Sequence, residues 1–425
     1  MLDKQTATNI MKAVDENFDE QIDCTAELVK YPSTRGQEQT AQDFMARQMA
    51  KRELSVDRWK IEVADIENLP GYSPVNVSYE NAFSVVGSQR SISNKGQSLI
   101  LNGHLDVVPT GPVEKWNYPP FEPRIEGGWM YGRGSGDMKA GLVSCLFALE
   151  ALRRIGKKPA ADVYLQSVIE EEATGNGTLS CLQRGYNADA FLVTEPMGQF
   201  LMLAEMGIMW FQVQVRGNPQ HASVASQVGS NAIEHAFYLV EALKVLEKSW
   251  NESKSDYPEF DFLPAPVQFN LGKIQGGDWV SSVPAWCDFD MRIGFFPGQD
   301  LAWVRSEIEN CIQTAVENHG YLKDNPPQII YHGHQTEGYI LDKSDEVEKV
   351  LAQNHQIVFD KELAKIPMPG ATDGRFYSLY ADTPALVYGP KCRAPHGFNE
   401  AVEIESIRKT TQTIALFVAD WCGLE

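Results

Sequence analysis

The sequence predicts an α/β protein with a mostly parallel sheet, into which a smaller domain is inserted. Short β-rich runs at residues 98–102, 162–169 and 190–194 alternate with helical stretches, an order typical of parallel strands joined by helices. Near Gly207 the pattern changes to a strict alternation of apolar and polar residues, which indicates half-exposed strands. At 425 residues the chain is long enough for about two or three domains.

The larger domain is assigned to residues 1–207 and 337–425. Apolar residues at helical spacing predict helices over residues 6–30 and 37–52, and another that starts at Met138 and stops at Gly156. Residues 75–86 have strand character, and residues 178–184 form a short helix before the run at 190–194. After residue 337 the chain returns to alternating helix and strand, so we expect both segments to build one domain.

The inserted domain is assigned to residues 208–336. Strands are predicted at 211–216, 267–274, 286–293 and 328–331, with helices at 231–248 and 301–312. The resulting order βαββαβ is that of a ferredoxin-like unit.

Composition excludes several classes of protein. The net charge is −20 and no cluster of Lys or Arg follows a surface, so we expect no nucleic-acid partner. No apolar run approaches the roughly 18 residues of a membrane span, and the first residues lack the apolar core of a signal peptide. Seven dispersed cysteines without a CxxC pair suit a reducing compartment, which predicts a cytoplasmic protein.

Acids and histidines gather where the β-rich runs end. They are His104, Asp106, Asp137, Glu170, Glu171, Glu172, Glu195 and His396. Three consecutive glutamates raise one another's pKa, and a bound cation would neutralise them. A solvated surface charge run is the alternative explanation. The apolar run VYLQSVI directly before the triplet instead indicates the edge of a sheet.

The ligand types indicate the metal. Imidazole and carboxylate groups without thiolate suit Zn²⁺, Mn²⁺ or Co²⁺ better than a structural zinc site. Two histidines and three carboxylates, one of them bridging, would serve two ions about 3.5 Å apart. One further glutamate would then be free to take a proton from water, and such a site hydrolyses amides or esters.

Six ordered motifs carry a family resemblance: GHLDVVP, GRGSGDMKAG, EEE with ATGNG, TEP, QHAS and PHGFNEAV. Over almost its whole length the chain resembles the dizinc aminoacylase and carboxypeptidase superfamily. The acetylornithine deacetylase and succinyl-diaminopimelate desuccinylase branch is the most similar. The resemblance implies a zinc-peptidase-like catalytic domain with an inserted domain that serves as lid and dimer interface.

The resemblance also assigns roles to the acids and histidines. His104 and Glu195 would hold one metal, Glu172 and His396 the other, and Asp137 would bridge both. Five metal ligands follow: His104, Asp137, Glu172, Glu195 and His396. The peptide bond between Asp137 and Met138 is a candidate for the cis form that this family often has.

Two further acids would act beside the metals. Glu171 would be the general base, and Asp106 would accept the ring proton of His104 and fix its tautomer. Because three glutamates are adjacent, their register is ambiguous by one residue. The family's usual Asp-Glu-Glu pattern places Glu170 at the Asp position, and we adopt that register.

Substrate contacts are expected from the inserted domain and one loop. His221 resembles a histidine that the family delivers from the partner subunit, and Arg292 one that grips a substrate carboxylate. Gly370 and Thr372, in MPGATDGRF, resemble a loop that offers backbone donors. Ser281 stands where the family commonly has Asn, a departure that affects the acyl-group contact. The pair His332 and His334, in YHGHQ, is assigned a surface or hinge role rather than a chelating one.

The expected protein is a cytoplasmic dinuclear metal hydrolase that removes a formyl, acetyl or succinyl group from an N-acyl amino acid or related amine. Zn²⁺ is the first choice of metal, with Co²⁺ and Mn²⁺ as alternatives. The partners would be a small N-acyl substrate and a second copy of the chain, bound through the inserted domain. A dipeptidase or carboxypeptidase with the same site is the rival enzyme. A non-catalytic metal-binding protein is the rival of another class.

Overall fold

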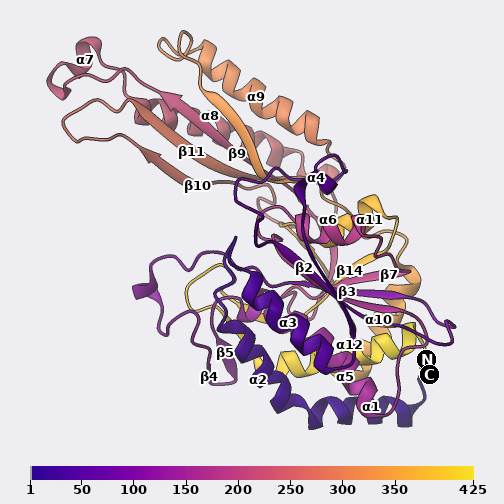
Figure 1. Ribbon diagram of the computed structural model, residues 1–425. Coiled ribbons are helices and arrows are strands. Elements are labelled where there is room, and N and C mark those ends of the chain that lie inside the picture. Colours follow the sequence, from indigo (N-terminus) through magenta and orange to yellow (C-terminus); the bar gives the residue numbers. More distant parts are fainter. Residues whose placement is uncertain (1) are drawn as a thin grey trace.

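A six-stranded sheet forms the centre of the larger unit in the computed structural model, which describes residues 2–425 (Figure 1). Three neighbouring strand pairs are parallel and the two at one edge are antiparallel. The predicted mostly parallel α/β architecture is therefore confirmed. In spatial order the strands are β1 (Ser55–Lys60), β2 (Phe83–Gln89), β6 (Val163–Val168), β3 (Leu99–His104), β7 (Ala190–Val193) and β14 (Ala385–Val387).

The central strands β3, β6 and β7 are buried along their whole length, which explains their richness in apolar residues, and the burial includes the polar Asn102, Gln166 and Ser167. Helices cover both faces of the sheet (Figure 1). On one side lie α1 (Lys4–Glu16), α2 (Phe18–Val29), α3 (Gln39–Lys51), α5 (Ala140–Arg154) and α12 (Ile404–Trp421). On the other lie α4 (Val63–Ile66), α6 (Asn176–Gln183) and α11 (Gly374–Tyr380), while α10 (Asp345–Phe359) packs on α12.

Two details differ from the sequence-based expectation. The helix expected over 6–30 is broken at Asn17, whose side chain donates to the Ala13 carbonyl at the end of α1. The strand expected over 75–86 begins only at Phe83. Close packing holds α5 at the sheet, since a Cβ on Gly141 would lie 2.0 Å from the carbonyl oxygen of Thr194.

Two small sheets complete this unit. β8 (Leu201–Glu205) pairs in parallel with β13 (Lys365–Met368). A four-stranded sheet has the order β15 (Cys392–Arg393), β16 (Ala401–Glu403), β5 (Trp129–Tyr131) and β4 (Arg124–Glu126). Both sheets join segments from the two ends of the sequence.

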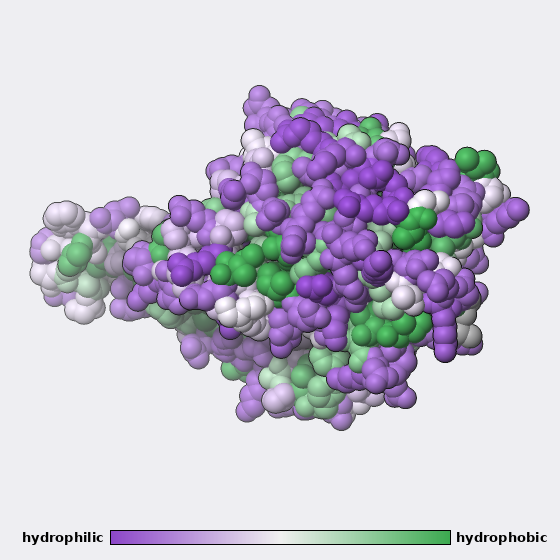
Figure 2. Space-filling model, turned by 90° about the horizontal axis from the view of Figure 1, so that it is seen from below, coloured by the Kyte–Doolittle hydropathy of each residue, from purple (hydrophilic) through white to green (hydrophobic). Residues whose placement is uncertain are grey.

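The lid, as we call residues 207–336, is an antiparallel sheet backed by two helices. Its strands are β9 (Gly207–Arg216), β10 (Phe269–Gly276), β11 (Trp286–Phe295) and β12 (Gln328–Thr336), in the order β10-β11-β9-β12. The helices α8 (Ala232–Glu252) and α9 (Leu301–Glu317) pack over its apolar core. This is the predicted βαββαβ unit, and it projects from the body with the short helix α7 (Ala225–Val228) at its far end (Figures 1 and 2).

The face seen in Figure 2 is mostly hydrophilic, with separate apolar patches. All seven cysteines are free thiols. Among residues 2–425 no helix combines the length and apolar character that crossing a bilayer requires.

Candidate metal centre

The predicted ligands meet at one edge of the central sheet. His104 is the last residue of β3, the glutamate triplet follows β6, and Glu195 follows β7. Because these three strands are parallel, their carboxyl ends share an edge. Asp137 comes from the turn before α5, and His396 from the loop between β15 and β16.

The ligand atoms form two groups that share Asp137. Nε2 of His104 lies 3.4 Å from Oδ1 of Asp137 and 3.6 Å from Oε1 of Glu195. Nε2 of His396 lies 3.4 Å from Oδ2 of Asp137 and 3.0 Å from Oε2 of Glu172. The two carboxylate oxygens of Asp137 therefore face different histidines, as a bridging ligand requires. The bond from Asp137 to Met138 is cis.

The buried atoms of this cluster fit divalent cations. Nε2 of His104 and Oε1 of Glu195 are buried and have no hydrogen-bond partner within residues 2–425. Buried polar atoms normally have partners, and a metal ion would complete both. The donors are nitrogen and oxygen only, which suits Zn²⁺, Mn²⁺ or Co²⁺.

The electrostatics describe a cluster with excess negative charge. Hydrogen bonds to Asp137 and Glu172 raise the pKa of His396 to about 11. Burial by itself would lower the pKa of His104, but Glu195 and Asp106 raise it well above 6.5. Burial raises the pKa of Glu195 well above its ordinary value. Each shift is one that a bound cation would relieve.

Asp106 contacts both His104 and the backbone of Glu171 and Glu172. Its carboxylate accepts the backbone amides of Glu171 and Glu172 at 3.3 and 3.1 Å. Nδ1 of His104 lies 3.0 Å from the Asp106 backbone carbonyl and 3.5 Å from its carboxylate. The nearer acceptor of the ring proton is thus the carbonyl rather than the predicted carboxylate. With Nδ1 protonated, the Nε2 lone pair faces the cluster.

Glu170 does not belong to the cluster. Its carboxylate is held by Arg35 and by the hydroxyl of Tyr79 at 2.7 Å. Glu171 instead lies in the cluster, with Oε2 3.8 Å from Nε2 of His104, and burial raises its pKa well above its ordinary value. The structure thus places Glu170 outside the cluster and Glu171 and Glu172 within it, and the division of roles between Glu171 and Glu172 stays a prediction.

The turn that carries Asp137 rests on a buried ion pair that the sequence did not reveal. Oε1 of Glu400 accepts the amides of Gly136 and Asp137 at 3.0 and 3.1 Å. Oε2 accepts the amide of Gly134 and Nη1 of Arg133. A Cβ on Gly136 would lie 2.2 Å from Sγ of Cys392, so this turn requires glycine. The only sequence signal was that these residues lie inside two of the quoted motifs.

A cavity of about 210 Å³ lies between the cluster and the lid, and residues of both line it. Arg292 of β11 and Gly370 line it, as predicted for substrate contacts. Burial lowers the pKa of Arg292, and its guanidinium pairs with no carboxylate in the described chain. A second cavity of about 300 Å³ shares Glu172, Trp210, Arg292 and His396 with the first.

Thr372 is not part of this cavity wall, which corrects its prediction as a substrate contact. Its backbone amide and its hydroxyl both donate to Glu205, at 2.8 and 2.7 Å. Both donors of Thr372 are thus used inside the protein, where Glu205 is fully buried.

His221 and Ser281 lie near the far end of the lid, away from the cluster of the same chain. His221 pairs with Ser282 in an isolated bridge, and the carbonyl of Ser281 accepts the amide of Ala222. The imidazole of His221 is exposed, and its Nδ1 lies 2.7 Å from the hydroxyl of Ser223 and accepts the backbone amide of Ser223 at 3.2 Å. Within one chain, neither predicted residue reaches the cavity.

The assignment of His332 and His334 to a surface or hinge role is wrong. His334 is buried and lines the metal-side cavity together with Trp210, and His332 lines the second cavity. The pattern YHGHQ did contain a usable signal. Residues at i and i+2 of a strand point to the same face, which here is the face that Arg292 occupies.

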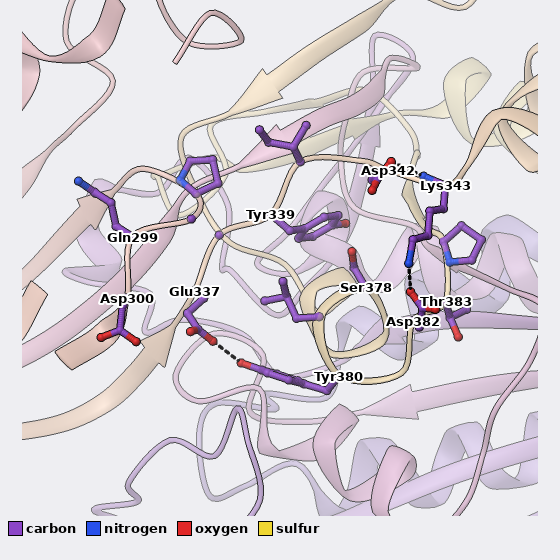
Figure 3. Close-up of a pocket in the computed structure, with 16 residues that line it drawn as sticks. Gln299, Asp300, Glu337, Tyr339, Asp342, Lys343, Ser378, Tyr380, Asp382 and Thr383 are labelled. Atoms are coloured by element: carbon purple, nitrogen blue, oxygen red, sulfur yellow. Dashed lines mark hydrogen bonds and ion pairs between the residues drawn. The ribbon is translucent and has the colours of Figure 1, made fainter. Parts of the chain in front are cut away.

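The largest cavity lies elsewhere. It measures about 670 Å³ and lies where the lid joins the body (Figure 3). Its polar groups satisfy one another: Tyr380 donates to Glu337 at 2.8 Å, and Lys343 pairs with Asp382. None of the predicted site residues lines it, so chemistry rather than size identifies the functional cavity.

An imidazole and carboxylate cluster at the carboxyl edge of a parallel sheet, under an inserted lid, defines a metal-dependent hydrolase. Residues 100–420 match peptidase family M20/M25/M40, and the chain belongs to this family. The predicted family and its hydrolysis of amide bonds are thereby confirmed, and membership implies divalent metal ions.

Two relatives are similar over the full length, and both are N-formyl-4-amino-5-aminomethyl-2-methylpyrimidine deformylases. The enzyme of Halalkalibacterium halodurans is 28% identical over 98% of this chain and 97% of its own. The enzyme of Bacillus subtilis is 29% identical over 99% and 98%. A succinyl-diaminopimelate desuccinylase of Thioalkalivibrio sulfidiphilus is 26% identical over 91% and 94%.

Solved structures share the fold. The di-peptidase Dug1p of Saccharomyces cerevisiae has a TM-score of 0.80 at 14% identity, with 98% of each chain covered. The metallo-carboxypeptidase Sso-CP2 of Sulfolobus solfataricus has a TM-score of 0.72 at 17% identity, covering 94% of this chain and 98% of that one.

Proposed function

We propose that the protein is a dinuclear metal-dependent deacylase that releases a small acyl group, formyl first, from the amino group of a small amine. The observation that carries this proposal is the position of Glu171 beside two ligand groups that share Asp137, which is the arrangement a water-activating dimetal site needs. A cavity of about 210 Å³ at the cluster favours a short acyl group.

The metal ions would be held by His104, Asp137, Glu172, Glu195 and His396, with Zn²⁺ as first choice and Co²⁺ or Mn²⁺ as alternatives. When bound, they supply Lewis acidity and lower the pKa of water. Glu171, buried and with a raised pKa, would take the proton of the attacking water and return it to the leaving amine. Arg292 would bind an oxygen of the substrate, because it faces the cavity without a carboxylate partner in residues 2–425.

The assembly proposed here is a homodimer of two-domain chains, with residues 1–207 and 337–425 as catalytic domain and 208–336 as lid. The place of His221 on the exposed end of the lid supports this, since the ring has no task in its own chain beyond Ser223. In a dimer, the partner's lid would bring its histidine to the oxyanion and Ser281 beside it. Seven free thiols favour a reducing compartment, the cytoplasm.

A dipeptidase is the second candidate, and Arg292 is the observation that favours it. An arginine without an acidic partner suits the terminal carboxylate of a dipeptide. The likeness to dipeptidase structures concerns the fold alone.

The deciding experiment is a substrate panel on Zn²⁺- and Co²⁺-loaded enzyme. It contains N-formyl, N-acetyl and N-succinyl amino acids, N-formyl-4-amino-5-aminomethyl-2-methylpyrimidine, and unmodified dipeptides. Release of free amine is measured as kcat/KM. We expect formamides to exceed acetyl and succinyl amides by at least about tenfold, because the two relatives that match nearly the whole chain are deformylases. Cleavage of dipeptides with no cleavage of any N-acyl compound would reject the deacylase.

A further inference from the structure

The polar face of the lid sheet forms the wall of the second cavity. Along β9 and β11, apolar residues point to the lid core, and polar residues between them point to the opposite face. Cross-strand pairing places Trp210 beside Arg292 and sets Asp290 between Lys273 and Gln212. Eight lid residues line the cavity of about 300 Å³, and six of them have a nitrogen or oxygen in the side chain: Trp210, Asn270, Lys273, Asp290, Arg292 and His332.

This cavity adjoins the metal centre. Glu172 and His396, two proposed ligands of one metal, line both cavities together with Trp210 and Arg292. A substrate whose amide lies at the metals would therefore place its second part against the lid face. The metal-side cavity has room for the acyl group, so the leaving amine is the part that meets this face.

The hydrogen-bonding groups of the wall can be assigned. Nε2 of His332 lies 2.8 Å from Oδ1 of Asp290, and a carboxylate only accepts, so Nε2 carries the ring proton. Nδ1 is buried without a partner in the described chain, and it accepts when the ring is neutral and donates when the ring is an imidazolium. Nε1 of Trp210 only donates, and it too is buried without a partner among residues 2–425.

The wall is aromatic as well as polar. Trp210 meets His334 edge-on, with ring centroids 5.1 Å apart, and His332 at 6.3 Å. Gly333, between the two histidines, has φ of +60°, and a Cβ there would lie 2.4 Å from Trp210. The glycine thus lets β12 approach the indole, so that Trp210 and His332 line this cavity and Trp210 and His334 the metal-side one.

The wall carries charges of both signs. Asp290 is ionised, because hydrogen bonding by His332 and the charge of Lys273 lower its pKa despite burial. Lys273 and Arg292 are the cations of the same wall. A heteroaromatic amine would bring an N–H donor to Asp290 and a ring nitrogen to Trp210.

We infer that this face is a subsite for the leaving amine and that it selects a planar heteroaromatic amine carrying a ring-nitrogen acceptor beside an N–H donor. This inference rests on the proposed deacylase function and names the residues that choose its substrate. Asp290 accepts from the donor, Trp210 donates to the ring nitrogen, and the rings of Trp210 and His332 pack against the heterocycle.

The test compares two formamides on the metal-loaded enzyme. One is N-formyl-4-amino-5-aminomethyl-2-methylpyrimidine, and the other is N-formylbenzylamine, which keeps the aryl-methyl shape without ring nitrogens or amino group. The wild type should prefer the pyrimidine by at least about tenfold in kcat/KM, since unpaired buried groups penalise the analogue. The variants Asp290→Asn and His332→Ala should reduce this preference at least fivefold through KM, with kcat for the pyrimidine changed less than twofold.

Asp288→Asn is the matched control. Asp288 lies two residues away on the same face of β11, pairs with Arg216 at 2.6 Å, and lines no part of the cavity. This variant should keep both the preference and the activity of the wild type. Equal rates for the two formamides, or an equal loss with Asp288→Asn, would overturn the subsite.

A second measurement separates the subsite from the deacylase proposal. The free amine 4-amino-5-aminomethyl-2-methylpyrimidine is tested as a competitive inhibitor of whichever amide the enzyme hydrolyses, with benzylamine as comparison. If dipeptides prove to be the substrates, stronger inhibition by the pyrimidine, weakened in Asp290→Asn, still supports the subsite. Equal inhibition by both amines contradicts the subsite even if formamides are hydrolysed.

Discussion

Arg35 holds Glu170 by two hydrogen bonds, from Nε to Oε1 at 2.5 Å and from Nη2 to Oε2 at 2.8 Å. This ion pair turns the first carboxylate of the triplet away from the metal cluster. The backbone then delivers the next two side chains to the cluster, where Asp106 holds their amides. One ion pair outside the site thus sets which glutamate is placed to act as base.

The first prediction concerns this register. Glu171→Gln should lower kcat by about 10²- to 10⁴-fold, because the proton acceptor is lost, while both metals stay bound. Glu170→Gln should lower the melting temperature but reduce kcat less than tenfold. Steady-state kinetics with metal analysis of both variants checks this. If Glu170→Gln is the inactive protein, the register is shifted.

The second prediction concerns the bridge. Asp137→Ala should lose both metal ions on dialysis, since each oxygen of Asp137 faces a different histidine. His396→Ala should lose only one ion, because its partners Glu172 and Asp137 belong to one group. Metal content per chain, measured by plasma spectrometry, is the readout. Equal retention in both variants would contradict a shared ligand.

The third prediction concerns pH and metal uptake. His396 has a pKa of about 11 in the metal-free chain, so it is protonated at pH 7 and must lose that proton to bind a cation. Metal affinity should therefore rise with pH, by about tenfold per pH unit for each proton released. Competition with a chelator between pH 6 and 8 measures the slope. A dissociation constant independent of pH would refute the assignment.

The fourth prediction concerns Glu205, which is fully buried beneath Thr372. Burial raises its pKa from 4.5 to about 8. The folded state therefore holds a proton that the unfolded state loses above pH 4.5, and stability falls as pH rises from 4.5 to 8. The slope from this group is up to about 1.4 kcal/mol per pH unit. Glu205→Gln should flatten the decline in urea midpoint between pH 5 and 8, and an unchanged decline would exclude Glu205 as its source.

The fifth prediction concerns the dimer. His221→Ala should lose at least about tenfold in kcat if the ring completes the partner's site. Mixing this variant with Glu171→Gln should then restore activity, because a hybrid dimer contains one intact site. Random exchange gives about a quarter of the wild-type activity. Sedimentation measures the assembly. No recovery in a mixed population shown to exchange subunits would remove His221 from the site.

Much of the architecture was predictable because the buried face of an element requires apolar residues at a regular spacing in the sequence. The strands β3, β6 and β7 are rich in apolar residues, and the alternation along β9 marks a half-exposed sheet. The edge strands β1 and β14 were not predicted from the sequence. They have six and three residues, and at an edge of the sheet such short segments show too little apolar periodicity to be told from loops.

The cluster of proposed metal ligands was predictable because each ligand follows a strand or lies in a motif. The surroundings of residues where the lid meets the body were not predictable. His334 looks like a surface residue until the lid is placed against the body, and Thr372 looks exposed until Glu205 is seen beneath it. Both depend on packing between segments far apart in the sequence, which local spacing does not encode.

The support of the Asp137 turn by Glu400 also bears on when the site can form during synthesis of the chain. The two partners Arg133 and Glu400 are 267 residues apart, and His396 lies beside the second. A ribosome-bound chain that has emerged as far as Thr336 already contains every strand and helix of the lid, which can fold as a unit. The same nascent chain lacks both the buried carboxylate and one proposed metal ligand. The proposed metal centre can therefore be complete only when nearly the whole polypeptide has been made.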